Sequence, residues 1–139
     1  MPARQTVRPI EFLRSGLNPT YLSEPILKPG ATAYWLGQGI LQLEPTVRSD
    51  LPAVIISVGV HGDETVPIRL LDHWLQQWGR EADNVHRPML LILANPLAVA
   101  AGTRFIDHNM NRLFSVAEPE RGHAEAQRTV EIMTAVQAF

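Results

Sequence analysis

Two runs of consecutive apolar residues constrain the fold more than any other feature of this sequence. Residues 51–60 read LPAVIISVGV, and residues 88–96 read PMLLILANP. Runs this apolar and β-branched are typical of strands buried on both faces. Residues 65–79, between them, have an apolar stripe at helical spacing that predicts a helix packed on the core. The stripe is formed by Leu71, Trp74, Leu75 and Trp78. The order strand, helix, strand predicts a βαβ unit.

A β-hairpin is predicted ahead of this unit. Residues 32–45 read TAYWLGQGILQLEP, two short apolar runs around Gly37-Gln38-Gly39, where glycine supplies the turn and Pro45 ends the second strand. Residues 97–114 are read as a polar loop and residues 118–139 as a helix. The predicted fold class is α/β, with a mixed sheet flanked by helices and preceded by a β-hairpin.

The two ends of the chain are predicted to differ in organisation. Residues 1–30 are rich in Pro, Arg and small polar residues without a clear period, which predicts an N-terminal arm. At the other end, the helical pattern runs to Phe139 without a glycine cap or a basic last turn. We therefore expect residues 31–139 to be the N-terminal portion of a larger domain, and the chain to be truncated.

Composition excludes several classes of function. The 139 residues carry a formal net charge of −2, which gives no electrostatic footprint for nucleic acid or an anionic membrane. There is no cysteine, so any metal must be held by His, Asp or Glu. No apolar segment of signal-peptide or membrane-spanning length is present, and we expect a cytoplasmic location. The sequence contains no signal for an oligomeric state.

The segment GVHGDETVP, residues 59–67, follows the first buried strand and admits two interpretations. His61 and Glu64 could converge on one metal ion, because α/β proteins place their sites at the carboxyl ends of strands and Gly62 allows a tight turn. Alternatively, Asp63 caps the helix, Glu64 favours its dipole, and His61 is an ordinary strand-end histidine. Spacing alone favours the second interpretation, because His-x-x-Glu is a weak motif.

The loop after the second strand has the composition of an anion-binding segment. Arg104 and Arg112 flank FIDHNMN, and Asn111 adds further donors and an acceptor. Arginine recognises carboxylates through two parallel hydrogen bonds, which would suit a small, multiply anionic substrate. The alternative is that both arginines are surface residues paired with Asp107 or with the Glu-rich tail. Asp107 is interpreted as structural, and His108 has no partner that spacing can supply.

Together these segments resemble the succinylglutamate desuccinylase and aspartoacylase family. The family pattern is G-x-H-G-[ND]-E-x-x-P, then N-P-x-A, an arginine, and D-x-[DN]-[LM]-N-R-x-F. Here GVHGDETVP and LANPLAVAAGTRFIDHNMNRLF match its order and spacing. The resemblance covers roughly residues 30–139 and implies a zinc-carboxypeptidase-like fold. The long segment before the first motif resembles the bacterial desuccinylase branch, which hydrolyses N2-succinylglutamate to succinate and glutamate in arginine catabolism.

The resemblance also implies roles for five residues. His61 and Glu64 would be ligands of one Zn²⁺ per active site, while Arg104, Asn111 and Arg112 would bind the carboxylates of a small anionic N-acyl amino acid. The zinc would activate water for amide hydrolysis. No catalytic residue is matched within this chain. The third ligand, a histidine in a D-L-H-T strand, and the general-base glutamate are expected beyond residue 139. We therefore expect the chain alone to be inactive.

Three other functions remain open from the sequence. An aspartoacylase-like deacylase of another N-acyl acidic amino acid would use the same motifs. A peptidase acting on C-terminal residues is a second possibility within enzymes. A truncated, non-catalytic remnant of the fold is the alternative outside enzymes, although intact His-Glu and Asn-Arg pairs argue against it.

Overall fold

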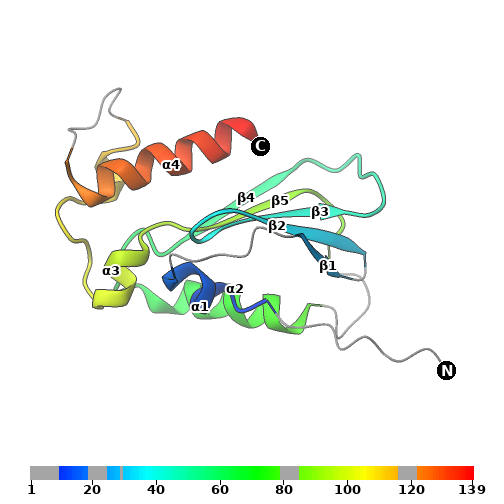
Figure 1. The fold of residues 1–139 in the computed structure, drawn as a ribbon, viewed down its shortest axis with the longest axis horizontal. Helices are drawn as coiled ribbons and strands as arrows, with labels where there is room; N and C mark the ends of the chain where they lie inside the picture. The colour runs from blue at the N-terminus through cyan, green and yellow to red at the C-terminus, as the bar shows by residue number, and fades with distance from the viewer. Residues whose placement is uncertain (1–9, 19–24, 29, 79–84, 116–121) are drawn as a thin grey trace.

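The computed structural model describes residues 10–18, 25–28, 30–78, 85–115 and 122–139 of the chain (Figure 1). Helices and strands are mixed along the chain, with a strand–helix–strand unit at residues 54–93. The elements are α1 (Phe12–Leu17), β1 (Ile26–Lys28), β2 (Ala31–Gly37), β3 (Ile40–Pro45), β4 (Val54–Val58), α2 (Thr65–Gln77), β5 (Met89–Leu93), α3 (Pro96–Ala101), the 3₁₀ helix η1 (Met110–Arg112) and α4 (Ala124–Ala138).

The strands form one mixed five-stranded sheet in the order β1-β2-β3-β5-β4. β4 and β5 are parallel neighbours joined through α2, which is the predicted βαβ unit. The other neighbouring strands are antiparallel. The predicted hairpin is β2–β3, in which Gly37 pairs with Ile40 across the turn. Gly39 has φ +65° in this turn, a conformation that glycine adopts without steric cost. The predicted fold class is confirmed.

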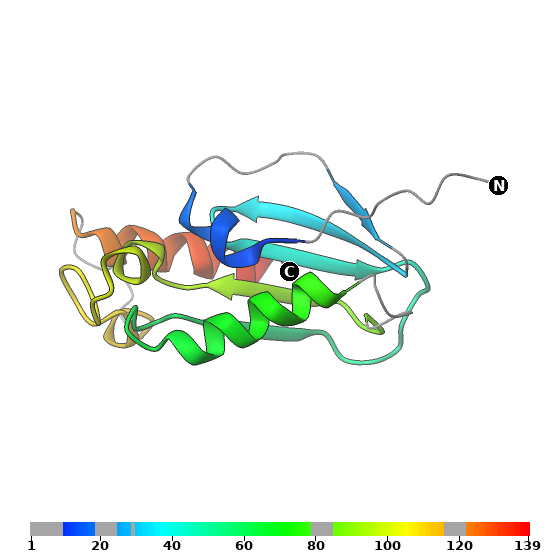
Figure 2. The ribbon, with the colours of Figure 1, turned by 90° about the horizontal axis from the view of Figure 1, so that it is seen from below.

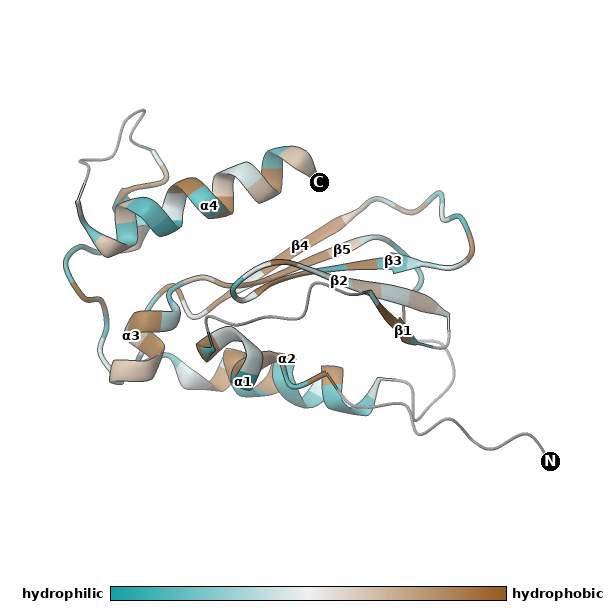
Figure 3. Ribbon diagram, in the orientation of Figure 1, coloured by the Kyte–Doolittle hydropathy of each residue, from teal (hydrophilic) through white to brown (hydrophobic). Residues whose placement is uncertain are grey.

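Helices cover both faces of the sheet, and each face has its own apolar core. In Figure 1, α1 and α2 lie on one side and α4 on the other. Viewed from below in Figure 2, α2 runs alongside β4 and β5. The α2 face is packed around Leu75, Leu91 and Leu93, and the α4 face around Leu90, Ile92 and Ile132. Figure 3 shows apolar residues concentrated on the central strands. Alternate residues of β5 thus face opposite layers, which explains its continuous apolar sequence.

Helix α2 has the apolar stripe that its sequence predicts. Leu71, Leu75 and Trp78 are buried, and Trp74 is partly buried against them. The tryptophans therefore contribute to the core, as predicted. The helix is described to Gln77, with Trp78 as its C-cap residue. The glycine at position 79, expected just after the helix, lies outside the described residues.

Four short elements are not predicted by the sequence pattern. α1 and β1 lie within residues 1–30, where no period is visible, and Phe12 of α1 is fully buried. α3 begins at Pro96 and continues into residues 97–114, which were interpreted as a loop, and η1 lies within that range. Elements of three to six residues are too short to display a periodic pattern, so they form here because tertiary packing and local caps stabilise them. Within the described part of the chain, no helix combines the length and apolar character that crossing a bilayer requires.

The core of the α4 face supports a matched stability prediction. Ile92 of β5 is 1% exposed and Ile55 of the neighbouring β4 is 45% exposed. Ile92→Val removes a methylene group from a packed core and should lower the free energy of unfolding by about 1 kcal/mol. Ile55→Val should change it by less than about 0.5 kcal/mol. Urea denaturation of both variants would measure the difference, and equal midpoints would contradict this assignment of the core.

Candidate metal and substrate site

The predicted site residues follow the carboxyl ends of β4 and β5. Because these strands are parallel, their following segments emerge at the same edge of the sheet. Pairing continues past the strands, as Ala94 N donates to Val58 O at 2.8 Å and Asn95 N donates to Gly59 O at 3.0 Å. The turn after β4 and the segment after β5 are therefore held side by side.

Two glycines allow the turn after β4 to pack tightly. Gly59 has φ +68°, which side chains rarely adopt. A Cβ atom on Gly62 would overlap the backbone carbonyl groups of Ala98 and Thr103. The N–H of Gly62 also donates to the carbonyl oxygen of Arg104, at 3.2 Å. The close approach of these backbones places the turn directly against α3 and the loop that follows it.

His61 and Glu64 meet within this turn. The Nδ1 atom of His61 lies 3.0 Å from Oε1 of Glu64. The imidazole is buried, whereas the Glu64 side chain is 57% exposed. Glu64, rather than Asp63, occupies the N-cap position of α2, and it makes no side-chain capping hydrogen bond. The Glu64 carboxylate is turned towards the imidazole. The interpretation of Asp63 as the helix cap is wrong, because this residue precedes the N-cap position.

The other side of the imidazole contacts η1. Nε2 of His61 lies 3.0 Å from Oδ1 of Asn109 and 3.4 Å from Nδ2 of Asn111. Oδ1 of Asn109 also accepts the backbone N–H of Asn111 at 3.3 Å, as the cap of the 3₁₀ turn. Asn109 is not among the site residues predicted from the sequence. Its position at a turn start, two residues before Asn111, is the signal that could have identified it, since asparagine commonly caps such turns.

The chemistry of this donor set fits a zinc ion. A neutral imidazole has one N–H. If Nε2–H donates to Oδ1 of Asn109, a lone pair on Nδ1 faces the Glu64 carboxylate. A lone pair on Nδ1 and a carboxylate oxygen only 3.0 Å apart repel each other unless a proton or a cation lies between them. Two atoms each about 2.0–2.1 Å from zinc stand roughly 3–3.5 Å apart, which agrees with this separation.

The two arginines of the predicted clamp are exposed. Arg104 lies beside the turn through its backbone carbonyl, and Arg112 follows Asn111 at the end of η1. Within the described residues, neither guanidinium makes an ion pair, so the pairing with Asp107 that was an alternative is not observed. The structure brings His61, Glu64 and Asn111 into contact but leaves both arginine side chains facing solvent.

Asp107 and His108 have structural contacts. Oδ2 of Asp107 accepts the N–H of Ala124 at the start of α4, at 3.2 Å. The carboxylate therefore bonds backbone, as interpreted, but that of a helix rather than of its own loop. His108 packs edge-on against His123, with ring centroids 4.2 Å apart. Both contacts tie the loop to the first turn of α4.

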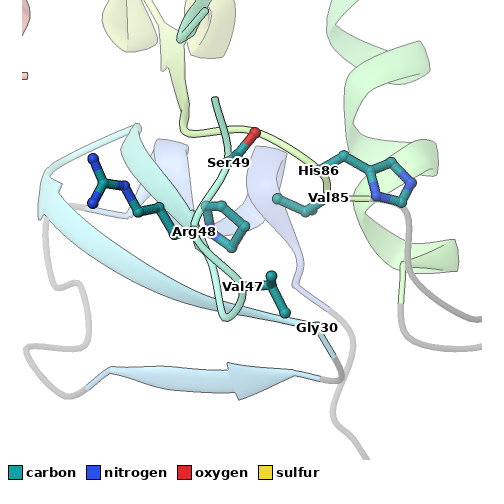
Figure 4. Close-up of a pocket in the computed structure, with 7 residues that line it drawn as sticks. Gly30, Val47, Arg48, Ser49, Val85 and His86 are labelled. Carbon is teal, nitrogen blue, oxygen red and sulfur yellow. The ribbon is translucent and has the colours of Figure 1, made fainter. Parts of the chain in front are cut away.

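A separate cavity of about 170 Å³ lies at the opposite end of the sheet. Its lining includes Pro45, at the end of β3 remote from the hairpin turn, and Val85 and His86, which precede β5. In Figure 4 the side chains of Arg48 and His86 extend away from each other. The cavity contains none of the predicted site residues, and no cluster of chemistry-bearing groups converges on it.

Comparison with known proteins identifies the family of this chain. The sequence model of the succinylglutamate desuccinylase/aspartoacylase catalytic domain matches residues 50–139. The chain belongs to this family. It is 39% identical over 107 residues to succinylglutamate desuccinylase from Burkholderia thailandensis, covering 76% of this chain and 31% of that protein. It is 30% identical over 131 residues to the Pseudomonas syringae pv. tomato enzyme of the same name, covering 94% and 39%.

Solved structures of family members share the fold. The succinylglutamate desuccinylase of Chromobacterium violaceum superposes with a TM-score of 0.82 at 29% identity, over 92% of this chain and 40% of that one. The Vibrio cholerae protein gives 0.79 at 28% identity, over 97% and 41%. The chain thus spans about a third to two-fifths of the length of these relatives.

In this member of the desuccinylase/aspartoacylase family, Asn109 offers a test of how His61 is oriented. Asn109→Ala removes the oxygen that faces Nε2, while His61 and Glu64 remain. Removing such a partner of a ligating histidine typically weakens metal binding 10–100-fold, so we expect roughly a tenfold loss of zinc affinity. Competition with a chromophoric chelator would measure it. Asn18→Ala, at the end of α1, serves as a control, and an unchanged affinity in Asn109→Ala would contradict the orienting role.

Proposed function

We propose that this chain supplies the metal- and anion-binding part of a zinc-dependent amidohydrolase. Its reaction would remove the succinyl group from N2-succinylglutamate, giving succinate and glutamate in arginine catabolism. The observation that carries the proposal is the contact of one buried imidazole with Glu64 on one side and Asn111 on the other. The names of the relatives, succinylglutamate desuccinylases, support the choice of substrate.

In this proposal, Nδ1 of His61 and the carboxylate of Glu64 hold the metal. Asn109 keeps the proton on Nε2, so that Nδ1 presents its lone pair. Zinc, when bound, would lower the pKa of a coordinated water and polarise the amide carbonyl. The described residues contain no group of three or more His, Asp or Glu that could hold a metal. The third ligand would therefore lie outside the described residues, and the resemblance to the family implies the same of the general base.

The substrate would be held by the loop after β5. N2-succinylglutamate carries three carboxylates, and Arg104 and Arg112 supply two guanidinium groups that are not ion-paired within the described residues. Guanidinium groups bind carboxylates through two parallel hydrogen bonds, and Asn111 can donate a further one beside His61. These residues would orient the acyl amide next to the metal while the carboxylates remain in the clamp.

Ligand titration of the labelled chain tests this function. With zinc present, N2-succinylglutamate should produce saturable NMR shifts in the Asn111 side chain and in the arginine Nε signals of positions 104 and 112. Arg112→Ala should weaken binding about tenfold, the usual loss for one charge-assisted contact. Arg69→Ala, which removes an exposed arginine of α2, should leave binding unchanged.

The choice of comparison ligands separates the alternatives. N-acetylaspartate should bind more weakly than N2-succinylglutamate, and a neutral acyl amide should not bind. Equal or tighter binding of N-acetylaspartate would favour an aspartoacylase-like deacylase instead. No saturable shift with any acidic ligand, in a folded chain with zinc present, would contradict the proposed function.

A further inference from the structure

Glu125 is a buried carboxylate that the proposed reaction does not use. It lies in the first turn of α4 and is 1% exposed. Its Oε1 accepts the backbone N–H of Ile106 at 2.6 Å, and its Oε2 accepts that of Asp107 at 3.1 Å. A weaker contact joins Oε2 to His108 N at 3.4 Å. Nδ2 of Asn95 donates to Oε1 at 3.2 Å. One carboxylate therefore accepts hydrogen bonds from three consecutive backbone N–H groups of the loop.

The loop that Glu125 holds continues directly into the site. Residues 106–108 are followed by Asn109 and Asn111, which contact His61. Through Asn95, the same carboxylate also reaches the end of β5, because Oδ1 of Asn95 caps α3 by accepting Ala98 N at 3.2 Å. Glu125 thus connects the start of α3 with the loop that follows this helix.

The tie between the loop and α4 is reciprocal. While Glu125 accepts from the loop, Asp107 of the loop accepts from the first N–H of the helix, at Ala124. One turn further along, the buried Arg128 donates to the carbonyl oxygens of Leu93 at 2.7 Å and Ala94 at 2.9 Å. The helix is therefore anchored to both the loop and the end of β5, and Glu125 has little freedom to move.

The hydrogen bonds favour the ionised form of this carboxylate. Burial acts to raise the pKa of Glu125, but the N–H groups of Ile106 and Asp107 and the amide of Asn95 lower it, and the net result is a pKa below its ordinary value. The loop contacts are therefore complete at neutral pH. They are lost only as pH falls through the depressed pKa.

We propose that Glu125 is a positioning residue whose carboxylate sets the conformation of residues 106–112, so that Asn109 and Asn111 meet His61 and the anion clamp can form. This inference rests on the proposed function for its effect on ligand binding. Its structural part, the dependence of the loop on an ionised carboxylate, stands independently. Glutamine has the same shape but would direct an NH₂ group at backbone donors, so the charge and its two acceptor oxygens matter.

Glu125→Gln tests the proposal, with Glu131→Gln as the matched control. Glu131 is on the same helix, its side chain is 61% exposed, and its replacement removes the same charge. In Glu125→Gln the amide signals of residues 106–108 should shift and exchange faster, while those of β5 stay as in the unmodified chain. Binding of N2-succinylglutamate with zinc present should weaken about tenfold. Glu131→Gln should leave both measurements unchanged.

A pH titration separates positioning from a general structural role. In the unmodified chain, the amide shifts of Ile106 and Asp107 should titrate in acid with the depressed pKa of Glu125. In Glu125→Gln this step should vanish. Within residues 106–108 and 123–128, the other charged or titratable groups are Asp107, His108, His123 and Arg128. Of these, Asp107 is the other carboxylic acid, and Asp107→Asn should preserve the step.

The outcomes distinguish this inference from the function on which it rests. Unchanged loop shifts and exchange in a folded Glu125→Gln would overturn the positioning role. So would an acid step that survives this substitution. If the loop changes as expected but the unmodified chain binds no anionic ligand, the positioning of the loop stands and the proposed function fails. If Glu125→Gln does not fold, the acid titration of the unmodified chain tests the positioning role by itself. Absence of the acid step in the amide shifts of Ile106 and Asp107 would then overturn it.

Discussion

Gly62→Ala is expected to destabilise the chain by about 3 kcal/mol, the upper end of the usual cost of overpacking. The added Cβ would overlap the carbonyl groups of Ala98 and Thr103, which are backbone atoms and cannot rotate away. The turn would have to separate from α3, and His61 would move with it. Urea denaturation would measure the loss of stability, and the chemical shifts of the His61 ring would report its displacement.

Gly102→Ala is the control for this substitution. Gly102 ends α3 with φ +65°, and a Cβ there would meet nothing within 4 Å. Alanine at this position should cost only about 1–2 kcal/mol, from backbone conformation alone. It should leave the His61 signals in place. If Gly62→Ala is no more destabilising than Gly102→Ala, the close packing of the turn against α3 is wrong.

His61→Ala is expected to lower the zinc affinity of the chain by about a hundredfold or more. The substitution removes one of two proposed ligands, and the loss should exceed the 10–100-fold typical of a residue that only supports a ligand. His73→Ala is the matched control, because this histidine is exposed on α2. Calorimetric titration with zinc would compare both variants with the unmodified chain. Equal losses in the two variants would show that zinc binds non-specifically.

The βαβ unit and the hairpin could be predicted because their strands are apolar runs, the helix has an apolar stripe and the hairpin turn is marked by glycine. Residues 88–96 are apolar up to Asn95, and β5 within them is buried between two helical layers. The prediction of burial on both faces is wrong for β4, because it lies at the edge of the sheet and leaves Ile55 and Ser57 exposed. α1 and β1 could not be predicted in the same way. Phe12 is fully buried, but a single buried aromatic in a six-residue helix leaves no repeating pattern. Its burial depends on the fold of residues far along the chain.

α3 has recognisable start and stop residues in its sequence. Asn95 accepts Ala98 N as the N-cap, Pro96 occupies the first turn, and Gly102 ends the helix in the left-handed region. These are standard helix start and stop residues, separated by only six positions. The segment was nevertheless interpreted as a loop, because the residues that follow Gly102 are mostly polar.

The contacts of the site residues could be anticipated only in part. The spacing of His61 and Glu64 allows convergence on one ion but does not require it, and only the folded turn shows Glu64 facing the imidazole rather than capping α2. The contacts of His61 with Asn109 and Asn111 cross about fifty positions, so no local pattern encodes them. Glu125 likewise reaches its loop from the next helix.

In the proposed site, Nδ1 of His61, oriented by Asn109, binds zinc together with Glu64. Long-range ¹H–¹⁵N NMR of the histidine rings during zinc titration tests it most directly. We predict that Nδ1 of His61 takes the shift of a metal-bound nitrogen, while Nε2 keeps its proton and its hydrogen bond to Asn109. The other histidines should not respond at the same zinc concentration. A His61 ring that does not respond, or that binds zinc through Nε2, would contradict the assignment of Nδ1 as a zinc ligand.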